Sequence, residues 1–340
     1  MKKTLLLVVL NLFGLLVMGQ DPHFSQYYAS PLTLNPALTG SFNADFRVAA
    51  NYRNQYFGEF GRPQFTYDTY SVSFDAALLR KKLDLDQLGV GLVFLSDVAG
   101  NGALTQNTIQ ASIAYHKVLD RFNRHTLSLG LQGGITQEHI NFQKLLFESQ
   151  YVDAVQDFVS TQPTGENVLK SSIIYPNMSI GVLWRSRLGK IINLYLGFVY
   201  ANAIMPKESF LGDGSNKLDS RFATHGGVDI KLGKYVTLTP GFMFQIQDAA
   251  MDAVPGIAVG YELNDISSIY FGTWYRVNDA VIPMVAYEIH GFRVGASFDA
   301  TVSDQKVANS SKGAFELTLI YIHNNKPPRD FSPVKFCPRF

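Results

Sequence analysis

Charged residues recur at alternate positions of several segments, and they are the residues whose spacing could support chemistry. They are Arg47, Arg53, Asp75, Asp229, Glu262, Arg276, Glu288, Arg293, Asp299 and Glu316. Both signs are present, so these side chains can pair across an enclosed interior and narrow or plug it, or they can line a path for polar solutes. Burying them unpaired would be costly. The leading candidates for such an interior are Arg47, Arg53, Asp75, Glu262, Arg276 and Glu288.

Motifs for catalysis or metal binding are missing from the sequence. It contains no HExxH, CxxC, Walker or GxSxG motif, and Gly89-Val90-Gly91 lacks the third glycine and the following helix of a dinucleotide fingerprint. The only cysteine, Cys337, cannot form an internal disulfide. We therefore expect no catalytic residue, no metal site and no cofactor. A barrel hydrolase with a dispersed triad is the remaining enzymatic alternative.

The elements that carry these charges alternate between apolar and polar residues. Segments 69–76, 126–132 and 292–299 show this period of two, which predicts strands with one apolar and one polar face. About fourteen strands are expected. Their predicted spans are 46–54, 69–76, 88–96, 107–116, 125–136, 174–184, 191–200, 221–231, 236–246, 255–262, 268–276, 281–289, 291–299 and 313–322.

A transmembrane antiparallel β-barrel fits these strands better than a soluble sandwich. The strands are long enough to cross a membrane when tilted, and polar lumen-type residues follow one face. Pro240 removes a ladder donor inside a strand, and a bulge there would accommodate it. Aromatic residues at strand ends suggest interfacial girdles: Tyr52, Tyr56, Tyr67, Tyr70, Tyr115, Trp184, Tyr195, Tyr200, Trp274 and Tyr275.

Both termini differ from the barrel, which we expect to cover residues 44–323. Lys2 and Lys3 precede an apolar run, which predicts a cleaved signal peptide over 1–20. Residues 21–43 form an N-terminal segment, and residues 324–340 form a C-terminal tail. The net charge of +1 gives no basis for capturing nucleic acid.

Two non-strand segments are candidates for binding. The aromatic and proline-spaced N-terminal segment is predicted to pack inside the barrel or along its periplasmic mouth, where it would plug the lumen, dock a partner or simply lead into the first strand. The longest loop, 137–173, would cover the barrel mouth, bind a partner or be solvated. The plug or partner candidates are Phe24, Tyr27, Tyr28, Asn35 and Pro36.

The segments 21–40 and 46–55 together closely resemble the opening of the PorP/SprF family of Bacteroidota outer-membrane proteins. The likeness continues over the whole mature chain, although Tyr56 stands where the family often has tryptophan. It is carried by 95–100, 114–117, 129–134, 206–210, 225–227, 272–280, 313–317 and 337–340.

This resemblance implies a role with the type IX secretion system or the linked gliding-motility apparatus. The expected protein anchors or escorts a secreted surface adhesin, or a component of the machine, in the outer membrane. The alternative is a porin-like or ligand-gated transport channel. The family is known for partners and not for an active site, so no catalytic residue is implied.

Overall fold

The computed structural model describes residues 23–55, 67–79, 83, 85–100, 103–145, 148–152, 157–158, 170–210, 216–304, 306 and 311–323. The predicted signal peptide, 1–20, and the tail, 324–340, with Cys337, lie outside these residues. Among the described residues, no helix is long and apolar enough to span a membrane.

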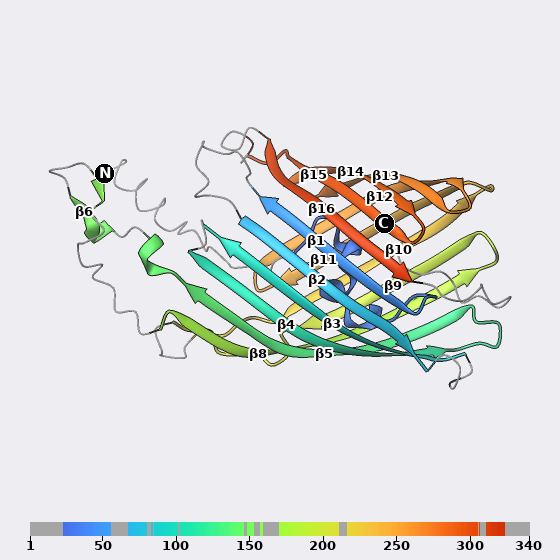
Figure 1. The fold of residues 1–340 in the computed structure, drawn as a ribbon, viewed down its shortest axis with the longest axis horizontal. Coiled ribbons are helices and arrows are strands. Elements are labelled where there is room, and N and C mark those ends of the chain that lie inside the picture. Colours follow the sequence, from blue (N-terminus) through green and yellow to red (C-terminus); the bar gives the residue numbers. More distant parts are fainter. Residues whose placement is uncertain are drawn as a thin grey trace, which may run out of the picture.

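Fourteen antiparallel strands form one closed barrel, which confirms the predicted fold class (Figure 1). Its strands, in chain order, are β1 (Phe46–Gln55), β2 (Tyr67–Leu78), β3 (Gln87–Ala99), β4 (Leu104–Val118), β5 (His125–Ile140), β8 (Ser172–Leu188), β9 (Ile192–Ala201), β10 (Arg221–Leu232), β11 (Val236–Gln247), β12 (Ala250–Asn264), β13 (Ser267–Arg276), β14 (Ala280–Ile289), β15 (Phe292–Thr301) and β16 (Lys312–His323). Each strand pairs with its neighbour in this order, and β1 pairs with β16 to close the barrel.

The alternation in the sequence becomes an apolar outer surface and a polar interior. In β2, Val72 and Phe74 face outward, whereas Ser71 and Ser73 are buried on the inner face. Antiparallel strands place successive side chains on opposite faces, so each strand repeats this division. An apolar outer surface is what contact with lipid requires.

The two ends of the barrel differ in their connections. At one end, here called the turn end, the strands are joined by 79–86, 119–124, 189–191, 233–235, 265–266 and 290–291. At the other, the loop end, they are joined by 56–66, 100–103, 141–171, 202–220, 248–249, 277–279 and 302–311. The longest connections lie at the loop end, as expected for the outer side of such barrels.

Two expectations about the strands are corrected. The long loop is shorter than predicted, because β5 continues to Ile140 and β8 begins at Ser172; it includes the short strands β6 (Tyr151–Val152) and β7 (Asp157–Phe158). Pro240 causes no bulge: the register between β10 and β11 is the same on both sides of it, and the ladder only skips the pairs opposite Thr239 and Pro240. The missing N–H of Pro240 thus interrupts the hydrogen-bonded ladder locally and does not change the register.

The barrel wall is uneven in height. Strands β4, β5 and β8 contain 15, 16 and 17 residues, whereas β9 contains 10. A tilted strand needs about 9–11 residues to cross the membrane. The pairing of β8 with β9 begins at Ile180, so the excess length of β8 lies at the loop end. In Figure 1 the wall strands β3, β4, β5 and β8 extend furthest on that side.

Residues 23–42, here called the inner segment, lie inside the barrel. They form the 3₁₀ turn η1 (Tyr27–Ala29), the single helical turn α2 (Pro31–Leu34) and the 3₁₀ turn η2 (Pro36–Leu38). These blue coils are visible behind β1 to β3 in Figure 1. Prolines occupy the first positions of α2 and η2, where the absent N–H would have had no partner within the turn.

Candidate functional site

The inner segment crosses the barrel from the loop end to the turn end. His23 lies 3.4 Å from Asp252, which is near the start of β12 at the loop end. Gly40 lies against Gly89, which is near the start of β3 at the turn end. Of the two predicted locations, the interior is therefore the one occupied. Leu32, Asn35 and most other side chains between these ends are fully buried.

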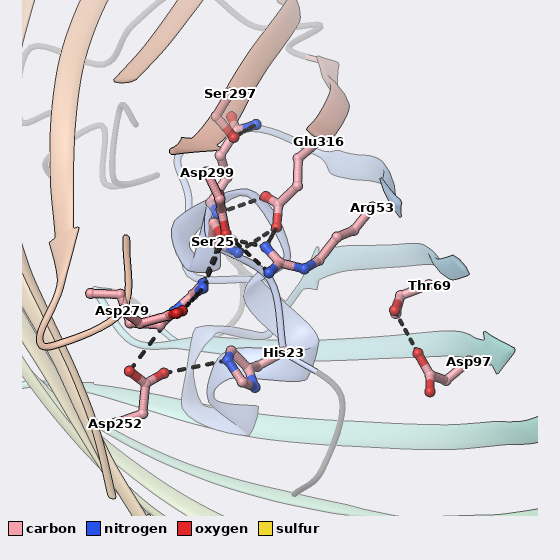
Figure 2. A network of polar contacts seen from close by, with 12 residues as sticks. His23, Ser25, Arg53, Thr69, Asp97, Asp252, Asp279, Ser297, Asp299 and Glu316 are labelled. Carbon is pink, nitrogen blue, oxygen red and sulfur yellow. Dashed lines mark hydrogen bonds and ion pairs between the residues drawn. The ribbon is translucent and has the colours of Figure 1, made fainter. Parts of the chain in front are cut away.

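At the loop end, Ser25 is enclosed by a network of charges (Figure 2). Asp299 accepts hydrogen bonds from Arg53 and Arg276, both at 3.0 Å, and from the Ser25 hydroxyl at 2.7 Å. Arg53 also pairs with Glu316. Because these groups are almost completely buried, their mutual pairing offsets the loss of hydration.

Glu316 binds the backbone of the inner segment directly. Its two carboxylate oxygens accept hydrogen bonds from the N–H groups of Ser25, at 2.5 Å, and Gln26, at 2.8 Å. The Gln26 side chain donates to the hydroxyl of Ser297 at 3.0 Å. An ionised acceptor strengthens such bonds, so the last strand of the barrel holds the beginning of the segment.

An aromatic cluster follows this polar network. The ring centroid of Trp274 on β13 lies 5.4 Å from those of both Tyr27 and Tyr28. The Tyr27–Tyr28 and Tyr27–Trp274 pairs are edge-to-face, a favourable arrangement for aromatic rings. All three side chains are buried, so the interior here is apolar and closely packed.

At the turn end, a second charged pair holds the end of the segment. Arg47 donates two hydrogen bonds to Asp75, at 2.9 and 2.7 Å, and one to the carbonyl of Leu38 at 3.1 Å. Asp75 also accepts from the N–H of Gly40 at 2.7 Å. His116 lies 2.8 Å from the carbonyl of Thr39. The side chains of Arg47 and Asp75 are both completely buried.

Between the two networks, glycines on the inner wall give the segment room. A Cβ atom at Gly130 would lie 2.3 Å from backbone atoms of Pro36 and Ala37, and one at Gly181 would lie 2.0 Å from Oδ1 of Asn35. That same oxygen accepts from the N–H of Ala37 at 2.8 Å, while the amide nitrogen of Asn35 lies 3.0 Å from His225. The wall and the segment are therefore complementary at close range.

The candidate residues fall into three groups. Phe24, Tyr27, Tyr28, Asn35 and Pro36 are all buried in the inner segment. Arg47, Arg53, Asp75 and Arg276 lie inside the barrel in the two charged networks. The structure places Glu262 and Glu288 elsewhere, on the wall of a cavity of about 440 Å³ at the turn end, where Glu288 pairs with Arg293.

Two aromatic residues expected at the membrane interface lie in the interior instead. Trp274 and Tyr195 are buried, whereas Tyr70, Tyr115, Trp184 and Tyr275 are exposed on the outer surface. The alternation already contained the signal for Trp274, because it is two residues from Arg276 and so shares its inward face. His225 was also missed, since a single histidine in a strand has no distinguishing pattern.

Among the described residues, no group of three or more histidine, cysteine or acidic side chains is arranged to hold a metal ion. The charged residues instead bind one another and the inner segment. This arrangement is suited to holding a polypeptide in place inside a membrane barrel.

A closed antiparallel barrel with an apolar outer surface and a polar interior defines an outer-membrane protein. The model of the family described as type IX secretion system membrane protein PorP/SprF matches residues 17–321, and the chain belongs to this family. It is accordingly a type IX secretion barrel of the outer membrane. No curated protein sequence matches the chain significantly.

Solved structures support the fold. The toluene transporter TbuX of Ralstonia pickettii is 8% identical, with a TM-score of 0.50 over 90% of this chain and 96% of that one. The toluene transporter TodX of P. putida is 10% identical, with a TM-score of 0.50 over 86% and 93% of the two chains. The CymD monoaromatic hydrocarbon channel is 10% identical, with a TM-score of 0.50 over 90% and 96%. At these identities the likeness concerns the fold alone.

Proposed function

We propose that this barrel anchors or escorts a secreted surface protein, or a component of the type IX secretion or gliding machinery, at the outer membrane. The observation that carries the proposal is the inner segment. Its backbone donates hydrogen bonds at both ends to the buried carboxylates Glu316 and Asp75, and between them it packs against wall glycines. A filled interior suits a membrane anchor better than an open path for solutes.

The segment itself is proposed to act as a plug. It contacts inward side chains from opposite parts of the wall, such as Asp252 on β12, Gln132 on β5 and Glu316 on β16. Holding a segment by buried charges on several strands makes its spontaneous release costly. The barrel is therefore expected to stay closed while the protein serves as an anchor.

The first experiment compares conductance with partner retention. The full chain, purified from its native outer membrane with a mild detergent, is expected to carry a stoichiometric surface or machine protein and to show no large, persistent open state in planar bilayers. A matched variant with residues 21–40 deleted is expected to conduct. An intact barrel that conducts steadily and carries no protein would instead support the transport alternative.

The deletion also separates the plug from the anchor. If the deleted variant folds and conducts but keeps its partner, the inner segment closes the lumen and the partner binds elsewhere. If it folds, stays closed and keeps the partner, neither role belongs to this segment. Resistance of the barrel to unfolding in sodium dodecyl sulfate without heating reports folding in each case.

A further inference from the structure

One edge of the barrel wall is left without a strand partner at the loop end. The ladder between β8 and β9 begins at Ile180 and Tyr200, whereas β8 itself begins at Ser172. Residues 172–179, here called the free edge, pair with β5 on one side only. An unpaired strand edge presents a row of N–H and C=O groups to any extended chain beside it.

The chain that follows β9 covers this edge without forming a strand. Among the described residues, one backbone hydrogen bond joins it to the free edge, from Ala203 to Met178 at 2.9 Å. A second, from Lys170 to Phe210 at 3.2 Å, joins it to the chain just before β8. Asn202 and Met205 have positive φ angles of 54° and 44°, which interrupt extended geometry. Residues 203–210, here called the cover, thus lie beside the free edge, but residues 206–208 pair with 216–218 and not with β8.

The direction of the free backbone groups follows from the bond to Met178. Its carbonyl points toward the cover, and in an antiparallel strand alternate residues direct their backbone groups to the same side. Ser172, Ile174 and Pro176 therefore face the cover as well. A proline at 176 is consistent with this, because its missing N–H is not needed by the ladder with β5.

The surroundings of the free edge determine what chain would fit. On the inner face, Tyr175 and Asn177 line a cavity of about 60 Å³ together with Gln106, Gln110, Asn202 and Arg221. On the outer face, Ile174 is 66% exposed. An added strand would therefore place polar side chains toward the amide-lined cavity and apolar ones outward.

We infer that the free edge of β8 binds an extended segment of the secreted surface protein by strand addition, displacing residues 203–210. This inference rests on the proposed function and names the docking site. Backbone hydrogen bonds would supply the affinity, and the alternation of polar and apolar side chains would supply the specificity. The free edge is at the loop end, the outer side of such barrels, where a surface partner can reach it.

Proline substitutions test the edge without altering the ladder to β5. Ser172→Pro and Ile174→Pro remove donors that face the cover, and they are expected to lower the amount of co-purified partner by about tenfold, the effect of losing one or two backbone hydrogen bonds. Ser172→Thr and Ile174→Val keep the N–H groups and should retain the partner. Resistance to sodium dodecyl sulfate confirms that all four barrels fold.

A reversible lock provides a second variant. In a Cys337→Ser background, Met178→Cys with Ala203→Cys is designed to fix the cover to the edge by a disulfide. The oxidised protein should lose the partner and the reduced protein should regain it. Equal partner binding in both forms, with the disulfide verified by mass spectrometry, would overturn displacement of the cover.

Photo-crosslinking identifies the occupant. A photoreactive phenylalanine at Ile174 should crosslink to an extended segment of the co-purified protein, whereas the same group at Ile135, which is outward-facing on β5 opposite Pro176, should not. A product formed only within the chain overturns the inference. If the proline variants keep the partner, the docking site is wrong but the anchor function stands. If the unaltered protein carries no partner, the proposed function is wrong and the docking site falls with it.

Discussion

Arg47 and Asp75 stand directly opposite each other on β1 and β2, and their side chains form two parallel hydrogen bonds of 2.9 and 2.7 Å. Neither side chain is exposed, and the same carboxylate accepts the N–H of Gly40. The pair therefore connects the first hairpin of the barrel to the end of the inner segment. This double role makes it the most informative place to perturb the structure.

Breaking this pair from one side should be strongly destabilising. Asp75→Ala removes the carboxylate that balances a buried guanidinium, which typically costs about 3–5 kcal/mol. The double variant Arg47→Met with Asp75→Leu should recover a large part of this loss. The measurement is the temperature at which the barrel unfolds in detergent. The pair Lys117–Asp86, in which the lysine is exposed, is the control, and Lys117→Met should change stability by no more than about 1 kcal/mol. Equal effects at the two pairs would contradict the assigned burial.

A side chain at Gly130 should displace the inner segment. Gly130→Val places atoms where Pro36 and Ala37 lie, and overpacking of this kind costs about 1–3 kcal/mol or more. We expect faster protease cleavage of the segment in the intact barrel. Gly133→Ala on the same strand is the control, because its new Cβ would approach nothing nearer than 3.8 Å. Unchanged cleavage in Gly130→Val would show that the segment does not rest on this part of the wall.

Tryptophan fluorescence can report the position of the inner segment. The sequence contains two tryptophans, and Trp184→Phe leaves only Trp274, which packs against Tyr27 and Tyr28. Its emission should be shielded from acrylamide. Deleting residues 21–40 should expose the ring to lumen water, which would shift the emission to longer wavelength and increase quenching. Trp184 alone, in Trp274→Phe, should respond little to the same deletion because it faces outward.

The direction of the segment predicts which side of the membrane its beginning approaches. His23 lies at the loop end beside Asp252. In a Cys337→Ser background, His23→Cys should react with a membrane-impermeant maleimide added to intact cells. A cysteine at Arg121, which is exposed in a connection of the turn end, should react only after the cells are opened. The reverse order of labelling would show that the barrel lies in the membrane with the opposite orientation.

The barrel could be predicted from the sequence because its physical cause is local. Each strand carries its own alternation, as in β2, and the contrast between lipid and lumen acts on every residue separately. The count of fourteen and the closure are confirmed. Strand ends were less predictable: β8 continues beyond its predicted span because pairing with β5, not its own pattern, extends it.

The candidate site was only partly predictable for a related reason. The alternation placed Arg47, Arg53, Asp75 and Arg276 on the inward face. Which side chains they pair with depends on contacts between distant segments, and the sequence pattern does not contain these. Trp274 was assigned to the interface because its position at a strand end outweighed its alternation with Arg276. The close approach of the inner segment to Gly130 and Gly181 could not be predicted, since glycine occurs in strands for many different reasons.

The hydrogen bond from Ser25 to Glu316 joins residues 291 positions apart, so the earliest part of the described chain is held by the latest strand. The beginning of the inner segment can therefore be held in place only once β16 lies beside β1. A chain that stops before β16 would lack the pairing that closes the barrel. It would also lack Glu316, which accepts the hydrogen bonds of Ser25 and Gln26 and is one of the two acids that pair with Arg53. Assembly of this molecule therefore has an order: only a polypeptide delivered to its last strand can bury its own beginning.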